Sequence, residues 1–138
     1  MLDRQFSVEI RTPEKLVYQG EVKSIHASGT NGAFQVLTGH IPFLTTIESG
    51  ELIVEDHHGI RSMVTSSGVF EVLRDGVTVL VESAEWSNEI DTQRAEEALQ
   101  RAREQLASQL PDMDYIFVEL ALARAVARLK VAKSSLLI

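Results

Sequence analysis

The sequence predicts an α+β fold in which an N-terminal all-β sandwich, or flattened barrel, precedes a C-terminal antiparallel hairpin of two helices. In residues 1–88 apolar side chains recur with a period of two, and turn residues separate short runs of them, as is typical of a sandwich. In residues 89–138 apolar side chains recur at helical spacing instead. We therefore expect two domains, with the boundary between residues 88 and 89.

The first domain is expected to consist of short strands, because each alternating run ends at a glycine, proline or aspartate. Asp75-Gly76 is a strong signal for a hairpin turn, and residues 56–59 (DHHG) are expected to form another hairpin loop. The expected strands cover residues 6–10, 16–18, 22–27, 34–37, 43–47, 51–55, 61–65, 69–73 and 77–81.

Two helices are expected after residue 88. The first covers about residues 91–110, and Asp91 is its expected N-cap because a carboxylate accepts hydrogen bonds from the unpaired amides of the first turn. A proline follows this helix, and Asp112 or Asp114 can cap a second helix that ends near Ala132. The expected facing stripes are Ala95, Ala98, Ala102 and Leu106 on the first helix, and Val118, Leu122, Ala125, Leu129 and Ala132 on the second. Small side chains bury little apolar area, so we expect a hairpin that is stable only when docked and is able to rearrange.

The composition excludes several classes of protein. The chain has 138 residues, 44% of them hydrophobic and 24% charged, which fits a globular protein in water. It has no cysteine, which rules out disulfides and thiolate metal sites. We see no apolar run that would make a signal peptide or a membrane-spanning helix, so we do not expect the chain to be embedded in a membrane.

Charge is distributed unevenly along the chain. The net charge is −7, and residues 1–88 carry 6 Lys and Arg against 12 Asp and Glu. Residues 120–138 carry basic side chains and no acidic one. The acidic body argues against nucleic acid as a partner. The basic helix predicts an anionic partner, either a phosphate ligand or an acidic protein surface.

No catalytic or metal site is expected. His57 and His58 are interpreted as solvated loop residues with diverging side chains, because no carboxylate pattern completes a ligand set. Ser66 has no nearby base, and the chain contains no glycine-rich phosphate loop. His40 lies in a loop with Gly39 and Pro42, and this combination is common in protein contacts. An ordinary loop histidine without a role in binding is an equally good interpretation.

The strongest candidate site is a group of arginines. Arg94 and Arg101 share one face of the first helix with Asp91, and the second helix carries two arginines one turn apart. If the helices fold back on each other, the guanidinium groups converge beside two carboxylates, and a polyphosphate would relieve their repulsion. The alternative is a solvated helix face with ordinary ion pairs. The residues concerned are Glu85, Asp91, Arg94, Arg101, Arg124 and Arg128.

Several segments match, in order and over essentially the whole chain, the motifs of one known family. They are residues 32–44 (GAFQVLTGHIPFL), 68–72 (GVFEV), 77–80 (VTVL), 84–85 (AE), 90–95 (IDTQRA) and 124–129 (RAVARL). In these motifs the chain resembles the epsilon subunit of bacterial F-type ATP synthase, the counterpart of the mitochondrial delta subunit. No single motif is decisive, but together over this length they are specific.

The resemblance implies a non-catalytic subunit of the central rotor stalk, peripheral at the cytoplasmic face of the bacterial cell membrane. Its sandwich would bind the gamma subunit and the ring of c subunits, coupling proton flow to ATP synthesis elsewhere in the complex. Its hairpin would be regulatory. An extended hairpin would reach the alpha/beta catalytic hexamer and inhibit ATP hydrolysis, whereas a folded hairpin would rest on the sandwich and bind ATP as a regulatory ligand.

The resemblance also assigns residues to two sites. The rotor interface would include Gly39, His40 and Pro42. The subunit would require no cofactor and would have no metal site. ATP would be a regulatory ligand, and its binding to the folded form alone would shift the population away from the inhibitory form. The ATP-binding residues would be Glu85, Ile90, Asp91, Arg94, Ala95, Arg101, Arg124 and Arg128.

Two departures from the family pattern stand out. Thr38 replaces the usual proline, which predicts a less rigid loop around His40. Residues 115–118 (YIFV) are apolar where the family often has charged side chains. Two alternatives remain open at this point: a structural rotor subunit whose hairpin inhibits without binding nucleotide, and a free-standing ATP-sensing module. An enzyme that acts alone is the least favoured.

Overall fold

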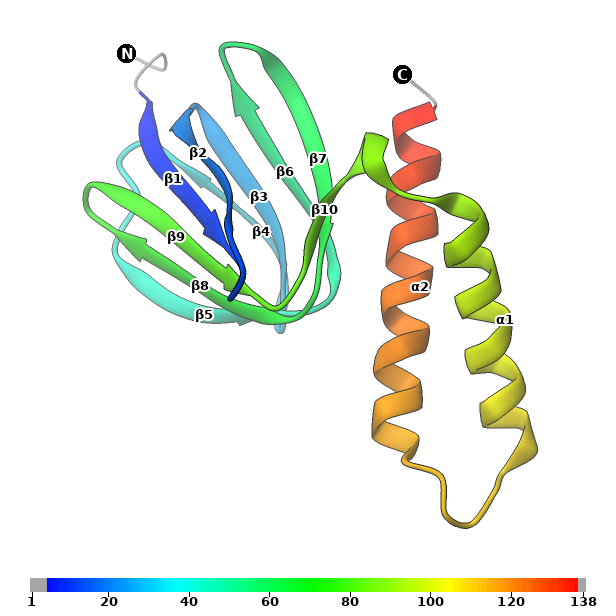
Figure 1. Cartoon of the computed structure of the whole chain (residues 1–138). Coiled ribbons are helices and arrows are strands. Elements are labelled where there is room, and N and C mark those ends of the chain that lie inside the picture. The colour runs from blue at the N-terminus through cyan, green and yellow to red at the C-terminus, as the bar shows by residue number, and fades with distance from the viewer. Residues whose placement is uncertain (1–4, 137–138) are drawn as a thin grey trace.

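Ten strands and two long helices make up most of residues 5–136, the part of the chain that the computed structural model describes (Figure 1). The strands form one sheet that bends into a nearly closed sandwich, and the helices form a hairpin beside it, so the expected fold class is confirmed. The strands are β1 (Phe6–Arg11), β2 (Leu16–Val22), β3 (Ser24–Gly29), β4 (Gly32–Leu37), β5 (Phe43–Ile47), β6 (Gly50–Asp56), β7 (Gly59–Thr65), β8 (Gly68–Leu73), β9 (Gly76–Val81) and β10 (Ala84–Trp86).

Alternation along the strands builds the core. In β1 the side chains of Phe6, Val8 and Ile10 are buried, whereas the residues between them face outward. The same pattern in the other strands gathers apolar side chains from both layers into one cluster, with Phe70 fully buried in it. Burial of these side chains is the main stabilising contribution to the sandwich.

The sheet contains pairings that the alternation does not reveal. Its strands run in the order β10-β7-β6-β3-β5-β8-β9-β1-β2, with β4 paired to β3. β1 pairs with β9 in parallel, although all other pairs are antiparallel. In the predicted hairpin at Asp75-Gly76, the two turn residues are Arg74 and Asp75, and Gly76 is already part of β9. Gly76 lies against β1, where an added Cβ would be 2.5 Å from the Ser7 Oγ atom.

Both long helices begin at aspartate caps. A 3₁₀ turn, η1 (Ser87–Glu89), leads from β10 into α1 (Thr92–Ser108), where the Asp91 carboxylate accepts a hydrogen bond of 3.1 Å from the Arg94 amide. Gln109, with a φ of 50°, ends α1 in a left-handed conformation. Asp114, rather than Asp112, caps α2 (Tyr115–Leu136) by accepting from the Phe117 amide.

These bounds correct two details of the sequence prediction. α1 ends two residues earlier than expected, and α2 continues past Ala132 to Leu136. The predicted domain boundary at residues 88 and 89 falls within η1, and it stays a prediction.

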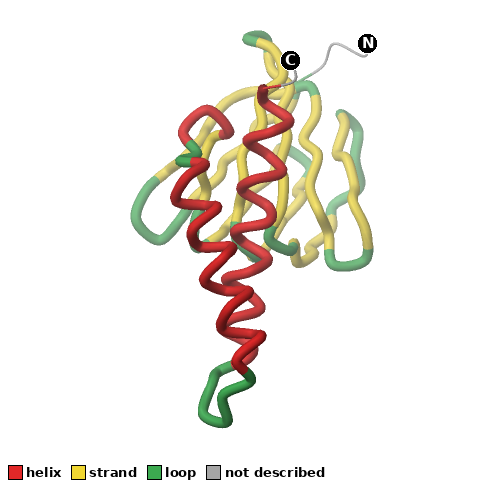
Figure 2. The backbone as a smooth tube through the Cα atoms, turned by 90° about the vertical axis from the view of Figure 1, so that its right-hand side faces the viewer, coloured by secondary structure: helices red, strands yellow, loops and turns green. Residues whose placement is uncertain are grey.

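The predicted facing stripes of the two helices are buried in part, since Ala98, Leu106, Leu122 and Leu129 are only half-buried. Ala95 and Ala102 of α1 are buried, as are Val118, Ala125 and Ala132 of α2. α2 lies between the sandwich and α1 (Figures 1 and 2), so it needs a second apolar face.

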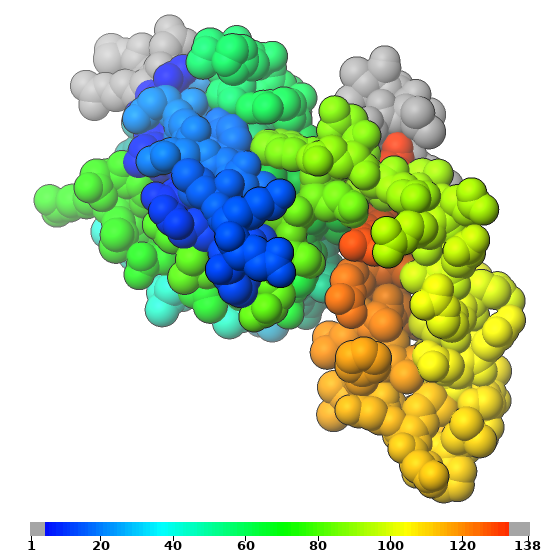
Figure 3. Space-filling view, viewed as in Figure 1, coloured from blue at the N-terminus to red at the C-terminus, as the bar shows by residue number. Residues whose placement is uncertain are grey.

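A small apolar cluster, which we call the docking cluster, joins the hairpin to the sandwich. Ala127 and Val131 of α2 are buried against Val64 of β7, and Ile90 packs on the edge of the group. The far end of the hairpin projects beyond the sandwich (Figure 3), and Ile116 and Phe117 near that end are exposed. The hairpin is therefore held at one end, through few side chains.

We expect Val131→Asp to release the hairpin without unfolding the sandwich. Val131 is fully buried in the docking cluster, and an aspartate there would bury an unpaired carboxylate, which costs several kcal/mol. Amide hydrogen exchange measured by mass spectrometry should become at least about tenfold faster in α2 while the core strands remain protected. Val126→Asp, at a site 47% exposed on the same helix, is the control and should leave exchange unchanged. Unaltered protection of α2 in Val131→Asp would contradict the proposed role of the cluster.

Candidate functional site

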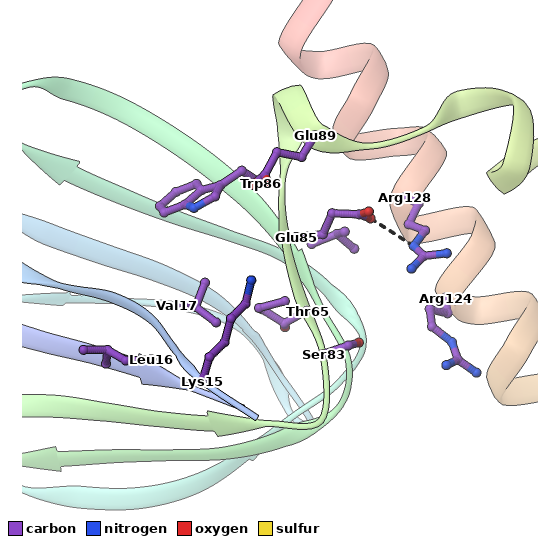
Figure 4. A pocket seen from close by; sticks show the side chains of 12 residues that line it. Lys15, Leu16, Val17, Thr65, Ser83, Glu85, Trp86, Glu89, Arg124 and Arg128 are labelled. Carbon is purple, nitrogen blue, oxygen red and sulfur yellow. Dashed lines mark ion pairs between the residues drawn. The ribbon is translucent and has the colours of Figure 1, made fainter. Parts of the chain in front are cut away.

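The predicted ATP-binding residues lie where the sandwich, η1 and the two helices meet. Glu85 is on β10, and Ile90 and Asp91 form the link into α1. Arg94 is in the first turn of α1. Arg124 and Arg128 are one turn apart on α2, next to β10 (Figure 4). Because the hairpin is antiparallel, predicted residues that are as far apart in the sequence as Glu85 and Arg128 meet at one junction.

A cavity of about 60 Å³ collects half of the predicted set. It is lined by Glu85, Asp91, Arg94 and Arg128. The Arg128 Nε atom is 3.2 Å from the Glu85 Oε1 atom, so the two side chains form an ion pair. The geometry of this pair does not meet the criteria for a hydrogen bond. This cavity is too small for a nucleotide, since ligand pockets measure roughly 300–1,000 Å³.

A larger cavity of about 460 Å³ adjoins the same ion pair. It lies between the sandwich and α2 (Figure 4), and it shares Glu85 and Arg128 with the smaller one. Arg124 borders it from α2. Its volume falls within the range of pockets that hold small molecules. The full lining is Lys15, Leu16, Val17, Val64, Thr65, Ser83, Ala84, Glu85, Trp86, Glu89, Arg124 and Arg128.

Three predicted residues stand apart from both cavities. Arg101 is exposed on α1 and lines neither one. Ala95 is fully buried in the helix interface, and Ile90 packs on the docking cluster. In this form of the protein, Ala95 and Ile90 therefore shape the junction by packing.

A polar network holds β10 against the sandwich beside this cavity. Asp56 is buried, and its carboxylate accepts hydrogen bonds from the Tyr18 hydroxyl, the His58 amide and the Arg61 guanidinium, at 2.8–2.9 Å. The Arg61 guanidinium lies 4.8 Å from the centre of the Trp86 ring, a cation–π contact. The network thus links β2, β6 and β7 to the strand that carries Glu85.

The network shifts the pKa values of two groups. Burial, and then the hydrogen bond to Asp56, raise the pKa of Tyr18 from 10.0 to about 12. Burial alone would raise the pKa of Asp56, but the hydrogen bonds from Tyr18, His58 and Arg61 outweigh it and hold that pKa below its ordinary value. Sequence reasoning missed this network because it assigned Asp56 to a loop. The signal was present, since Asp56 continues the inward alternation of Leu52 and Val54.

The predicted rotor loop is held by His40. Its Nδ1 atom lies 2.8 Å from the Leu37 carbonyl oxygen and its Nε2 atom 2.7 Å from that of Leu73, so the ring ties the loop to the end of β8. Its ring also packs edge-on against Phe6. Gly39 has a φ of 84°, which favours glycine there. Exposed apolar side chains occupy this loop and the adjacent strands: Leu37, Ile41, Phe43, Leu44 and Leu73.

His57 and His58 lie in the turn between β6 and β7. The rings of His57 and His58 lie 3.8 Å apart between their centres, which corrects the expectation that they diverge, and both residues are exposed. Within residues 5–136, no three His, Cys, Asp or Glu side chains gather as metal ligands would. In the same part of the chain, no helix combines the length and apolar character needed to cross a bilayer.

We expect Tyr18→Phe to lower the free energy of unfolding at pH 7 by about 1–3 kcal/mol, since it removes a hydrogen bond to a charged group. The pKa of Tyr18 is higher in the folded state, about 12, than its ordinary value of 10.0. The stabilisation from the hydroxyl is therefore complete below pH 10 and is lost as the pH rises to about 12.

The difference in unfolding free energy between wild type and Tyr18→Phe should accordingly shrink between pH 10 and pH 12, which urea titrations at each pH measure. Tyr115→Phe, at an exposed site next to the hairpin loop, serves as the control and should show a small difference at pH 7. A difference for Tyr18→Phe that stayed constant through pH 12 would contradict the role of this hydrogen bond.

Comparison with known proteins identifies the family. Residues 5–87 match the model of the beta-sandwich domain of the ATP synthase delta/epsilon chain, and residues 88–133 match the model of its long alpha-helix domain. The chain is 40% identical over 132 residues to an ATP synthase epsilon chain of Caldanaerobacter subterraneus subsp. tengcongensis, covering 95% of this chain and 96% of that one. It is 46% identical over 132 residues to an ATP synthase epsilon chain of Geotalea daltonii, with the same coverage.

Solved structures show the same fold. A chain of the mitochondrial ATP synthase of Euglena gracilis, in a structure of its OSCP/F1/c-ring, matches with a TM-score of 0.78 and 26% identity, over 97% of this chain and 82% of that one. A chain from the central stalk and c-ring of the Tetrahymena thermophila enzyme matches in fold, with a TM-score of 0.63 and 14% identity, over 96% of each chain. Because both domains match in order and over nearly the whole length, this chain belongs to the delta/epsilon family of ATP synthase chains.

Proposed function

We propose that this chain is a non-catalytic subunit of the central stalk of a proton-translocating F-type ATP synthase, in which it couples rotation of the c ring to ATP synthesis. Family membership supports this role, as does the match to a chain of the Euglena gracilis ATP synthase in a structure of its OSCP, F1 and c-ring. Its place in the cell would be peripheral, on the cytoplasmic face of the bacterial membrane.

The sandwich would be the rotor-binding part. The His40 loop, held on the sandwich through two carbonyl oxygens, presents exposed apolar side chains such as Ile41, which is 80% exposed. Exposed apolar groups on a loop that is tied to a folded domain are suited to a protein interface. We assign this surface, with Gly39 and Pro42, to contact with the gamma subunit and the c ring.

The hairpin would be the regulatory part, and ATP its ligand. The observation that carries this proposal is the convergence of Arg94, Arg124 and Arg128 at the junction of sandwich and hairpin, beside Glu85 and Asp91. Guanidinium groups bind phosphate oxygens in bidentate pairs. A ligand at 100 times its Kd stabilises the form that binds it by about 2.7 kcal/mol, enough to favour the folded hairpin.

The extended form would inhibit ATP hydrolysis. Release of the hairpin breaks the docking cluster and the Arg128–Glu85 ion pair, which are few contacts for so long an element. The freed α2 would then present basic side chains to acidic surfaces of the alpha/beta catalytic hexamer. ATP would oppose this by binding only the folded form.

A structural subunit without nucleotide binding is the second candidate. It is favoured by one observation: Glu85 already neutralises Arg128, and Asp91 already caps α1 through the Arg94 amide, so the junction is stable without a ligand. A free-standing ATP-sensing module remains a third reading, and stable co-purification with a gamma subunit would contradict it.

We expect the isolated wild-type chain to bind ATP saturably in calorimetric titration, and Arg94→Ala/Arg128→Ala to lose at least about tenfold in affinity. The double variant removes two guanidinium groups from the junction. Arg74→Ala/Arg103→Ala makes the same change of charge away from both cavities and should bind like wild type. If wild type binds no ATP up to millimolar concentration, the structural role replaces the ATP-sensing one.

We expect His40→Ala to weaken binding to a purified complex of gamma subunit and c ring by about tenfold, equivalent to about 1.4 kcal/mol. The substitution removes both contacts that hold the loop on the sandwich. His57→Ala, at an exposed turn on another hairpin, is the matched control. If surface plasmon resonance gives equal affinities for the two variants, His40 does not contribute to the rotor interface.

A further inference from the structure

The larger cavity has walls from both parts of the protein. Its hairpin wall is α2, with Arg124 and Arg128, and its sandwich wall comes from the loop before β2, from the start of β2 and from β7 and β10. A ligand that fills this space must touch both walls. Its affinity would then depend on the docked position of the hairpin, which is the requirement for a ligand that shifts a conformational equilibrium.

The sandwich wall presents a difficulty for an anionic ligand. All four arginines of the predicted ATP site lie on the hairpin, and the one predicted residue on a sandwich strand, Glu85, is a carboxylate that repels phosphate. Glu89 of η1 adds a second carboxylate to the cavity. With these residues alone, a polyphosphate would bind the hairpin and gain no charge-based attraction from the sandwich.

Lys15 resolves this difficulty. It is the one cationic residue of the sandwich among those that line the cavity, and Figure 4 shows it on the sandwich side, with Arg124 and Arg128 on α2 across from it. Its backbone is fixed by a tight turn, in which the Thr12 amide donates to the Lys15 carbonyl oxygen at 3.0 Å and the Thr12 hydroxyl accepts from the Lys15 amide. The base of this side chain is therefore held in place.

Two of the three cations on the cavity have no acidic partner. Arg128 is paired with Glu85, but within residues 5–136 neither the Lys15 ammonium nor the Arg124 guanidinium forms an ion pair. Unpaired cations on facing walls repel each other and attract an anion between them. The apolar side chains of Val17 and Trp86 border the same cavity, and they offer a surface for a planar base.

We propose that Lys15 is a phosphate-binding residue, so that a nucleoside triphosphate in the larger cavity is held between the sandwich and α2. The inference rests on the proposed ATP-sensing function and adds to it the contact that makes binding depend on docking. The phosphates would lie between the Lys15 ammonium and the Arg124 and Arg128 guanidinium groups. When the hairpin extends, these cations separate and the site is lost.

The test uses Trp86, the single tryptophan of the chain, as a reporter on the cavity wall. Its fluorescence is titrated with ATP and with inorganic triphosphate in the full chain, for wild type, Lys15→Gln, Lys15→Arg and the control Lys23→Gln. Lys23 is exposed and lies outside the cavity. We expect Lys15→Gln to bind both ligands about tenfold more weakly, and Lys15→Arg and Lys23→Gln to bind like wild type.

Hydrogen exchange of α2 gives a second readout. ATP should slow exchange in wild type, and at equal fractional occupancy it should slow it less in Lys15→Gln. Wild-type affinity and wild-type protection in Lys15→Gln would overturn the inference and leave ATP bound by the hairpin alone. A loss confined to ATP, with inorganic triphosphate unaffected, would overturn the phosphate contact. If wild type binds neither ligand, the ATP-sensing function fails and this inference with it.

Discussion

The contact between α2 and β7 is the constraint on which the rest of this structure depends. It is made by three buried side chains and one neighbour, Val64, Ala127, Val131 and Ile90. The sandwich has its own apolar core and does not need this contact to fold. The stripe that α1 turns toward α2 consists mostly of small side chains, and the position of the hairpin on the sandwich is determined mainly by this cluster.

This arrangement explains why charged groups collect at the junction. Both cavities border the docked helix, and both include Glu85 and Arg128, the ion pair that joins sandwich to hairpin. A partly exposed ion pair contributes little stability, and the docking cluster is small. An anionic ligand at the junction can therefore change the balance between docked and released hairpin, whereas it could not change the fold of the sandwich.

Most of the fold could be predicted because its elements follow from local patterns. Alternation located nearly all strands, and Asp91 located the start of α1. Alternation did not reveal β10, because three residues are too few to show a period. The parallel pairing of β1 with β9 could not be predicted either. The two strands come from opposite ends of the sandwich domain in the sequence, and the packing of the whole sheet brings them together.

The sequence alone determined the fold class, the helix stripes and the set of arginines, because each of these depends on spacing along the chain. Only the tertiary structure decided which residues share a cavity. It placed Arg124 on the same cavity as Lys15 and Trp86, separated Arg101 from them, and converted Asp56 from an expected loop residue into a buried hydrogen-bond acceptor. The physical reason is that these neighbours are set by the angle and depth at which α2 docks on β7 and by the closure of the sheet, and neither is encoded in the spacing of any one segment.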